Sequence, residues 1–197
     1  MKEQEKREKI IQAAYQVLSE RGYDAASTKE IAKVAGVAQG LVGYYFPSKD
    51  MLFAEVFRRE TERYCELLPF IRDQADREIN AETIKAVLSV PKARAEEHPS
   101  WIKLRYELFA LGMRNKAVSA NIRDTLESKR RHLSELIQLV GKLPDMQARK
   151  LAPILLAVFD GLGMQRLCDE NFDYDGAYET LAEMLNAYVQ SIAERKS

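Results

Sequence analysis

The chain has 197 residues, of which 46% are hydrophobic and 30% are charged. This composition excludes a disordered chain, and the length allows one ordinary domain or two small ones to bury a core without disulfides or metals. Thirty basic and thirty acidic residues give a formal net charge of zero. A nucleic-acid partner would therefore have to be recognised by a local site rather than by bulk charge.

No apolar run approaches the roughly 18 residues that a membrane-spanning helix requires. The opening stretch, MKEQEKREK, is too charged for the core of a signal peptide. We therefore expect a cytoplasmic protein without a membrane partner. Cys65 and Cys168 lie far apart and match no metal-binding or disulfide spacing, which favours packing roles for both. No metal and no cofactor is expected.

Apolar residues recur every three or four positions along almost the whole chain, which is the period of a helix. The sequence therefore predicts an all-α fold of about nine helices. Near the N-terminus, Ser27 and Glu30 form the capping-box pattern of a helix start, and Gly36 is suited to the turn that ends this helix. Two short helices that meet at such a turn have the outline of a helix-turn-helix. The helices expected in this part cover residues 6–21, 27–35, 39–45 and 48–70.

Longer helices separated by short loops follow and are typical of an antiparallel bundle. Their expected ranges are 80–97, 100–115, 118–141, 145–169 and 174–195. The predicted organisation is a helix-turn-helix head at residues 1–47, a connecting helix at 48–70 and a larger helical body at 71–197.

Two glycines in the third helix, Gly40 and Gly43, are not explained by an apolar core. Each costs about 1 kcal/mol of helix stability relative to alanine, and their spacing places both on one face. A helix face without side chains lets another rigid surface come close, which favours contact with DNA. The alternative is close packing of both glycines against the first helix.

Groups that can donate hydrogen bonds to DNA phosphates surround this face. They are Ser27, Thr28, Tyr44, Tyr45 and Lys49. Base reading is expected from Gln39, Leu41 and Tyr44, since glutamine can pair with adenine and leucine can contact the methyl group of thymine.

Residues 6 to about 60 resemble the DNA-binding head of the tetracycline-repressor (TetR) family of bacterial transcriptional regulators. The resemblance rests on Ser27, Ile31-Ala32, Ala35-Gly36-Val37, Gly40, Tyr45-Phe46, Ser48-Lys49 and Leu52. It implies that helix 39–45 enters the major groove and that the residues at the Ser27, Tyr45 and Lys49 positions hold phosphates. It also implies a ligand-binding body that dimerises through its last two helices. Ala38 and Gly43 depart from the family pattern, which usually has Ser or Thr and then Tyr at these positions.

Helix 100–115 is apolar on two faces, so we expect it to be central in the bundle, where it could line an effector cavity. Simple core packing is the alternative. Arg105 lies between the two faces and would have to be paired, reach solvent or meet an acidic ligand, whereas aromatic rings could cage a lipophilic cation. The candidate effector contacts are Trp101, Arg105, Tyr106, Phe109, Met113 and Phe159.

Apolar stripes on helices 145–169 and 174–195 are wide enough for a four-helix interface between two copies of the chain. Packing within one chain would also explain them. The candidate interface residues are Leu151, Leu155, Val158, Leu162, Leu181, Leu185, Tyr188 and Ile192.

An enzyme is not expected, because the two histidines, His98 and His132, lie in no catalytic or metal-binding motif and no phosphate-binding loop occurs. The sequence instead predicts a homodimeric transcriptional regulator that binds double-stranded DNA. With the resemblance, the expected protein is a repressor that a small lipophilic effector releases from a palindromic operator. The alternative is a helical adaptor that does not bind DNA.

Overall fold

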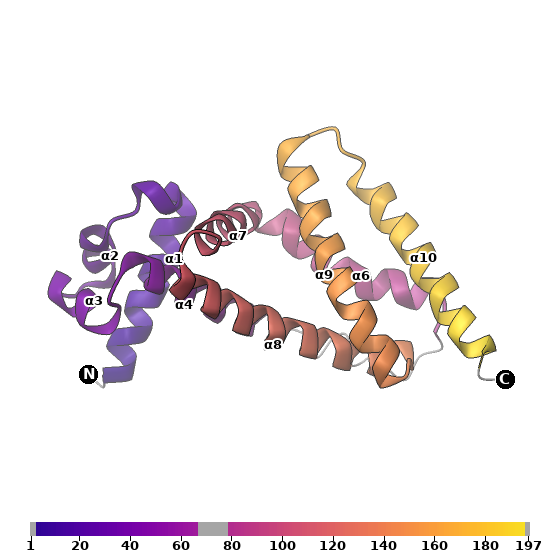
Figure 1. The fold of residues 1–197 in the computed structure, drawn as a ribbon. Coiled ribbons are helices and arrows are strands. Elements are labelled where there is room, and N and C mark those ends of the chain that lie inside the picture. Colours follow the sequence, from indigo (N-terminus) through magenta and orange to yellow (C-terminus); the bar gives the residue numbers. More distant parts are fainter. Residues whose placement is uncertain (1–2, 67–78, 196–197) are drawn as a thin grey trace. The chain divides into compact units, whose positions relative to one another are not determined.

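The computed structural model describes residues 3–66 and 79–195, and all regular secondary structure in these ranges is helical (Figure 1). The helices are α1 (Glu3–Ala25), α2 (Thr28–Ala35), α3 (Gln39–Tyr45), α4 (Lys49–Glu66), α6 (Ala81–Glu97), α7 (Pro99–Gly112), α8 (Lys116–Gly141), α9 (Asp145–Cys168) and α10 (Tyr174–Glu194). The predicted all-α fold with a helix-turn-helix near the N-terminus is confirmed.

The first helix differs from its expected range of 6–21. Gly22 leaves the helical conformation as expected, with φ of 76° and ψ of 174°, but a further helical turn runs on to Ala25. Glycine adopts this positive φ without the steric cost that a Cβ atom would add. The chain therefore kinks at Gly22 just before the loop that leads into α2.

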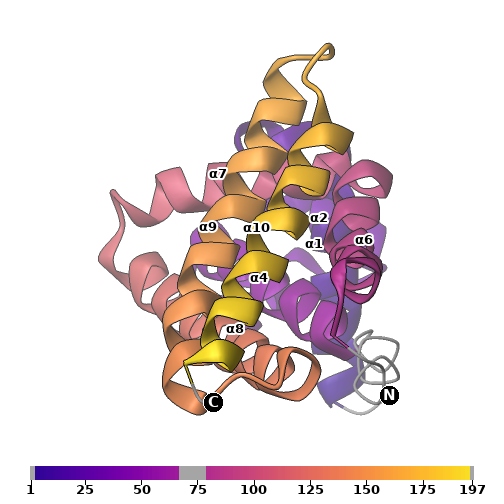
Figure 2. The ribbon, with the colours of Figure 1, turned by 90° about the vertical axis from the view of Figure 1, so that its right-hand side faces the viewer.

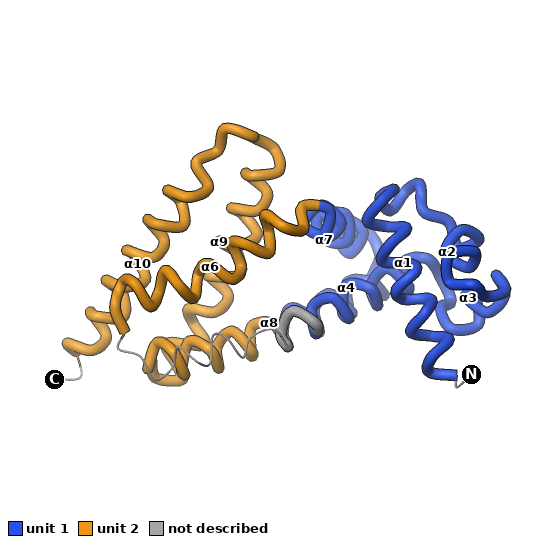
Figure 3. Tube along the Cα trace, turned by 180° about the vertical axis from the view of Figure 1, so that it is seen from behind, with its two compact units in different colours: residues 1–63, 100–126 blue, residues 64–99, 127–197 orange. Residues whose placement is uncertain are grey.

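The described chain forms two compact units, and each is made of two separate segments (Figure 3). Unit 1 consists of Met1–Arg63 and Ser100–Leu126, and unit 2 consists of Tyr64–Pro99 and Glu127–Ser197. This division differs from the three consecutive segments expected from the sequence. Most of the expected connecting helix belongs to the same unit as the head, while its last residues, 67–70, lie outside the described ranges.

One apolar core explains why unit 1 includes α4 and α7. Phe53 and Phe57 of α4 are completely buried among residues of α1, α2 and α3. The ring of Phe57 stacks on Trp101 of α7, with 5.2 Å between ring centroids. Two further α7 residues, Leu104 and Leu108, are buried in the same core. Helix α7 thus completes the core on which the helix-turn-helix rests.

Unit 2 contains α6, the second half of α8, α9 and α10. Helices α9 and α10 run antiparallel and are joined by the short loop at residues 169–173 (Figures 1 and 2). Tyr178 of α10 stacks in parallel on Phe159 of α9, at 6.3 Å between ring centroids. Leu155, Leu181 and Ala182 are buried beside this pair.

Helix α9 carries four exposed large apolar side chains, those of Met146, Ile154, Met164 and Leu167. By length and composition it is the one helix in the described residues that could cross a membrane, with a mean hydropathy of 1.4 over 18 residues of which 17% are buried. This corrects the expectation that no apolar stretch of the chain approaches the length of a membrane-spanning helix. Cys168 at its end is exposed, so the packing role expected for it is wrong. The side chain of Cys65 lies outside the described part.

Candidate nucleic-acid interface

Local capping positions the two helices of the helix-turn-helix. The Ser27 hydroxyl accepts a hydrogen bond from the backbone N–H of Glu30 at 3.2 Å, as the capping box predicts. The Glu30 carboxylate forms an ion pair with Arg21 at 2.6 Å. Gly36 ends α2 in the left-handed conformation, with φ of 65°, and α3 begins three residues later.

Helix α3 has a face without side chains. Val42 is buried in the core of unit 1, whereas a Cβ atom built on Gly40 or Gly43 would meet no atom within 4 Å. The alternative that these glycines allow close packing inside the chain is therefore wrong. At 3.6 residues per turn, the two glycines lie side by side and are flanked by Gln39 and Tyr44.

The side chains of α3 divide between this face and the core. Gln39 is exposed, and Tyr44 is 72% exposed. Leu41 and Tyr45 are half-buried and pack against the core of unit 1. The Tyr45 hydroxyl donates to the backbone carbonyl of Glu3 at 3.1 Å. Of the three residues expected to read bases, two therefore project from the helix and Leu41 packs inward.

Lys49, expected to contact a phosphate, has two partners inside unit 1. Its ammonium donates to the backbone carbonyls of Tyr23 at 2.7 Å and Ala26 at 3.0 Å, and lies 4.0 Å from the centroid of the Tyr23 ring. These carbonyls belong to the segment between the kink at Gly22 and Ser27. Lys49 thus ties the start of α4 to the loop that positions α2.

We expect Lys49→Met to lower the free energy of unfolding by roughly 2–4 kcal/mol, since each hydrogen bond to a charged group contributes about 1.5–3 kcal/mol and the methionine retains part of the packing. Urea unfolding followed by circular dichroism measures this change. Lys33→Met is the matched control, because Lys33 is exposed on α2. An equal stability of both variants would contradict the bracing role.

A polar network links the same loop to α4, to α7 and to the turn between α7 and α8. The Tyr23 hydroxyl donates to the Asp50 carboxylate, which also accepts from the Asn115 amide at 2.7 Å. The backbone N–H of Tyr23 donates to Glu107 at 2.9 Å. Burial, together with the hydrogen bond to Asp50, raises the pKa of Tyr23 well above its ordinary value. Sequence analysis missed these residues, because their partners are 27 to 84 positions apart.

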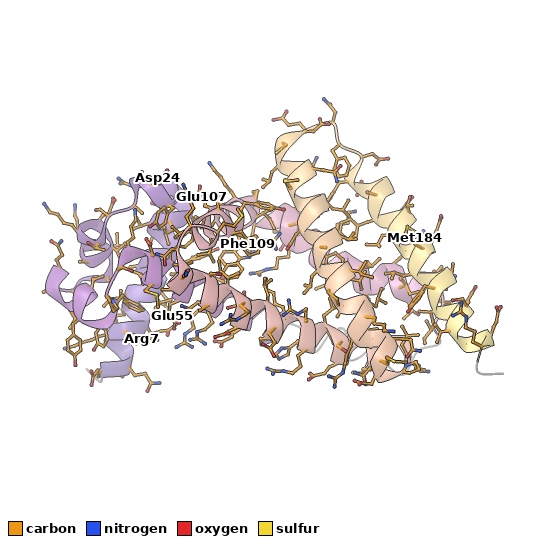
Figure 4. The ribbon with its side chains drawn as sticks, in the orientation of Figure 1. Arg7, Asp24, Glu55, Glu107, Phe109 and Met184 are labelled. Atoms are coloured by element: carbon orange, nitrogen blue, oxygen red, sulfur yellow. The ribbon has the colours of Figure 1, made fainter. Side chains whose placement is uncertain are left out.

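Ion pairs fix α1 against α4. Arg7 of α1 and Arg58 of α4 both contact the Glu55 carboxylate, at 2.8 and 2.7 Å, and Figure 4 shows Arg7 and Glu55 side by side. Burial raises the pKa of Glu55, but the two guanidinium groups outweigh it and hold the pKa below its ordinary value. Two exposed cations on α2, Lys29 and Lys33, were also missed, although their spacing of four places both on one side of the helix.

The candidate effector residues are divided between the two units. Trp101 is only 4% exposed and is part of the core of unit 1. Arg105 is also buried, and its guanidinium carbon lies 5.7 Å from the ring centroid of Tyr106. Phe109, labelled in Figure 4, is half-buried and meets the Tyr106 ring edge-on. Met113 is exposed, and Phe159 belongs to unit 2.

The candidate interface residues mostly pack within unit 2. Those that are buried in its core or packed against it are Leu151, Leu155, Val158, Leu162, Leu181 and Leu185. Ile192 is buried and Tyr188 is half-buried. The large apolar side chains that α9 and α10 leave exposed are instead Met146, Ile154, Met164, Leu167 and Met184.

Comparison with known proteins agrees with this architecture. The sequence model of "Bacterial regulatory proteins, tetR family" matches residues 10–56. The HTH-type transcriptional regulator YvdT of Bacillus subtilis is 51% identical over 51 residues, which are 26% of each chain. The HTH-type transcriptional regulator BetI of Rhizobium meliloti is 24% identical over 97% of this chain and 93% of its own.

A solved structure extends the similarity of the fold beyond the head. The multidrug binding protein EbrR, in complex with ethidium, aligns with a TM-score of 0.70 at 23% identity, over 90% of this chain and 96% of its own. Together these matches confirm the helix-turn-helix regulator predicted from residues 27–52 and disfavour the adaptor alternative. Residues 10–56 of the chain thus form a DNA-binding head of the tetR family of bacterial regulatory proteins.

Proposed function

We propose that the protein is a cytoplasmic homodimeric repressor that places α3 in the major groove of each half of a near-palindromic operator. The observation that carries this proposal is the bare face of Gly40 and Gly43, which no contact inside the chain requires. The start of α2, with Ser27 and Thr28, supplies donors to the flanking phosphates.

DNA binding is tested with the full chain and its own promoter region, by gel shift and footprinting at several salt concentrations. We expect two protected half-sites related by a two-fold axis, one helical turn or a multiple of it apart, because a two-fold dimer presents two recognition helices. Affinity should fall steeply with salt, since phosphate contacts release counterions. A chain that binds no DNA under any of these conditions would overturn the proposal.

The dimer is proposed to form through the exposed apolar side chains of α9 and α10. Ile154 is 59% exposed and Met184 is 64% exposed, and exposed apolar side chains that gather on neighbouring helices often mark a protein–protein interface. The resemblance to the TetR family, whose members dimerise through their last two helices, supports this choice.

We expect Ile154→Glu to convert the dimer to a monomer and to weaken operator binding by about 10²- to 10⁴-fold, the usual gain from joining two binding modules. Analytical ultracentrifugation measures the first effect and fluorescence anisotropy with operator DNA the second. Met113→Glu is the control, because Met113 is exposed on unit 1 and lies on neither helix. A dimeric Ile154→Glu variant would place the interface elsewhere.

A small lipophilic effector is proposed to bind against α7 and to lower the affinity for DNA. Tyr106 and Phe109 present half-buried aromatic rings at right angles to each other, which suits an apolar or cationic aromatic guest. The complex of EbrR with ethidium makes lipophilic cations the first class to screen.

Tetraphenylphosphonium and a medium-chain fatty acid serve as the two probes in a thermal-shift experiment without DNA. The probe that binds should raise the melting temperature of the wild type and of Lys103→Ala, a change at an exposed position of α7, but not that of Phe109→Ala. It should also weaken operator binding, and by linkage the operator must weaken probe binding by the same factor. An unchanged response in Phe109→Ala would remove this residue from the site.

A further inference from the structure

The recognition surface of α3 contains no charged side chain. The helix reads QGLVGYY, and its exposed side chains are those of Gln39 and Tyr44. The exposed cations of the helix-turn-helix are Lys29 and Lys33, which lie on α2. Base recognition by α3 therefore depends on one amide and one aromatic ring, on either side of the two glycines.

The chemistry of these two groups selects particular bases. A glutamine amide offers one donor and one acceptor, which match N7 and N6 of adenine in the major groove, whereas the two acceptors of guanine are best matched by arginine or lysine. The ring of Tyr44 is an apolar surface and can contact the methyl group of thymine.

The remaining α3 side chains do not compete for the bases. Val42 is buried and Leu41 packs against the core. The Tyr45 hydroxyl is directed to the carbonyl of Glu3. Because a Cβ atom on Gly40 or Gly43 would meet only open space, the backbone of α3 can come closer to the base edges than an ordinary helix. At such a distance even the short side chain of Gln39 can contact a base.

We propose that α3 reads each operator half-site through adenine at Gln39 and the methyl group of thymine at Tyr44, and does not select guanine. This inference rests on the proposed function, since it names the bases that the DNA-binding head recognises. It predicts operators whose half-site centres are rich in A·T pairs.

The test is selection from a random DNA library by the full-length wild type, Gln39→Ala, Gln39→Glu and Tyr44→Ala. We expect the wild type to prefer adenine at one position of each half-site by about 5- to 100-fold. Gln39→Ala should lose this preference, and Gln39→Glu should change it to cytosine, because a carboxylate accepts from the cytosine amino group. Thermal melts show whether each variant is folded, as expected for exposed positions.

The contact between Tyr44 and thymine is tested by removing the methyl group of the base. Replacing the thymine by deoxyuridine should weaken binding by the wild type several-fold but leave binding by Tyr44→Ala unchanged. Selection of guanine at the position that Gln39 variants alter, or the same selected sequence for all variants, would overturn the inference while leaving DNA binding intact. A wild type that enriches no sequence would overturn the proposed function together with it.

Discussion

Gly43→Leu is expected to abolish operator binding while the chain stays folded. The new side chain would project from the bare face of α3 into space that is open in the free protein, so no contact inside the chain is lost. Leucine also favours a helix over glycine by somewhat less than 1 kcal/mol, so the melting temperature should stay the same or rise. In the complex, the same side chain would hold the backbone of α3 away from the base edges. Fluorescence anisotropy should show at least about a hundredfold loss of affinity, the effect of losing several good contacts of 1–3 kcal/mol each.

Two comparisons make this result specific. Gly43→Ala should show an intermediate loss of affinity, because its methyl group fills part of the same space. Gln12→Leu adds an exposed leucine to α1 of unit 1 and should bind as the wild type does. If Gly43→Leu bound DNA normally, α3 would not approach the groove through its glycine face.

Trp101→Ala is expected to be the most destabilising of the substitutions considered, with a loss of about 3–5 kcal/mol in the free energy of unfolding. The indole is 4% exposed, stacks on Phe57 and lies 6.2 Å from the ring centroid of Tyr15. Its removal would leave a cavity between α1, α4 and α7. Chemical denaturation followed by circular dichroism measures the loss.

The same variant separates a core role from an effector role. Met113→Ala is the matched control on the stretch that follows α7, and its exposed position predicts a change within about 0.5 kcal/mol. A Trp101→Ala variant that kept the wild-type stability but no longer responded to an effector would show that the indole contacts the ligand instead.

The DNA-binding head could be predicted because its signals are local. The cap at Ser27, the left-handed turn at Gly36 and the exposed glycines of α3 each depend on residues a few positions apart. The roles of Lys49 and Trp101 could not be predicted in this way. Lys49 is braced by carbonyls 23 and 26 positions away, and Trp101 stacks on a residue of α4.

The interface residues predicted on α9 and α10 differ from the exposed ones because the spacing of apolar residues carries limited information. The spacing of apolar residues correctly predicted that α9 and α10 are helices. It did not show which apolar side chains pack within the chain and which remain exposed. The stripe around Leu155 and Leu181 packs within unit 2, while Ile154 and Met184 remain exposed. A second copy of the chain would therefore meet a surface next to the predicted one.

Because unit 1 is formed by two separate segments of the chain, the DNA-binding head cannot be grafted onto another protein as its N-terminal segment alone. A fragment that ends at residue 47 lacks α4. One that ends at residue 63 lacks Trp101, which stacks on Phe57, and Leu104 and Leu108, which are buried in the same core. Either fragment would expose a large apolar surface to water and should aggregate when expressed alone. A functional chimera must therefore carry residues 100–126 along with residues 1–63, so that the grafted recognition helix keeps the core on which it rests.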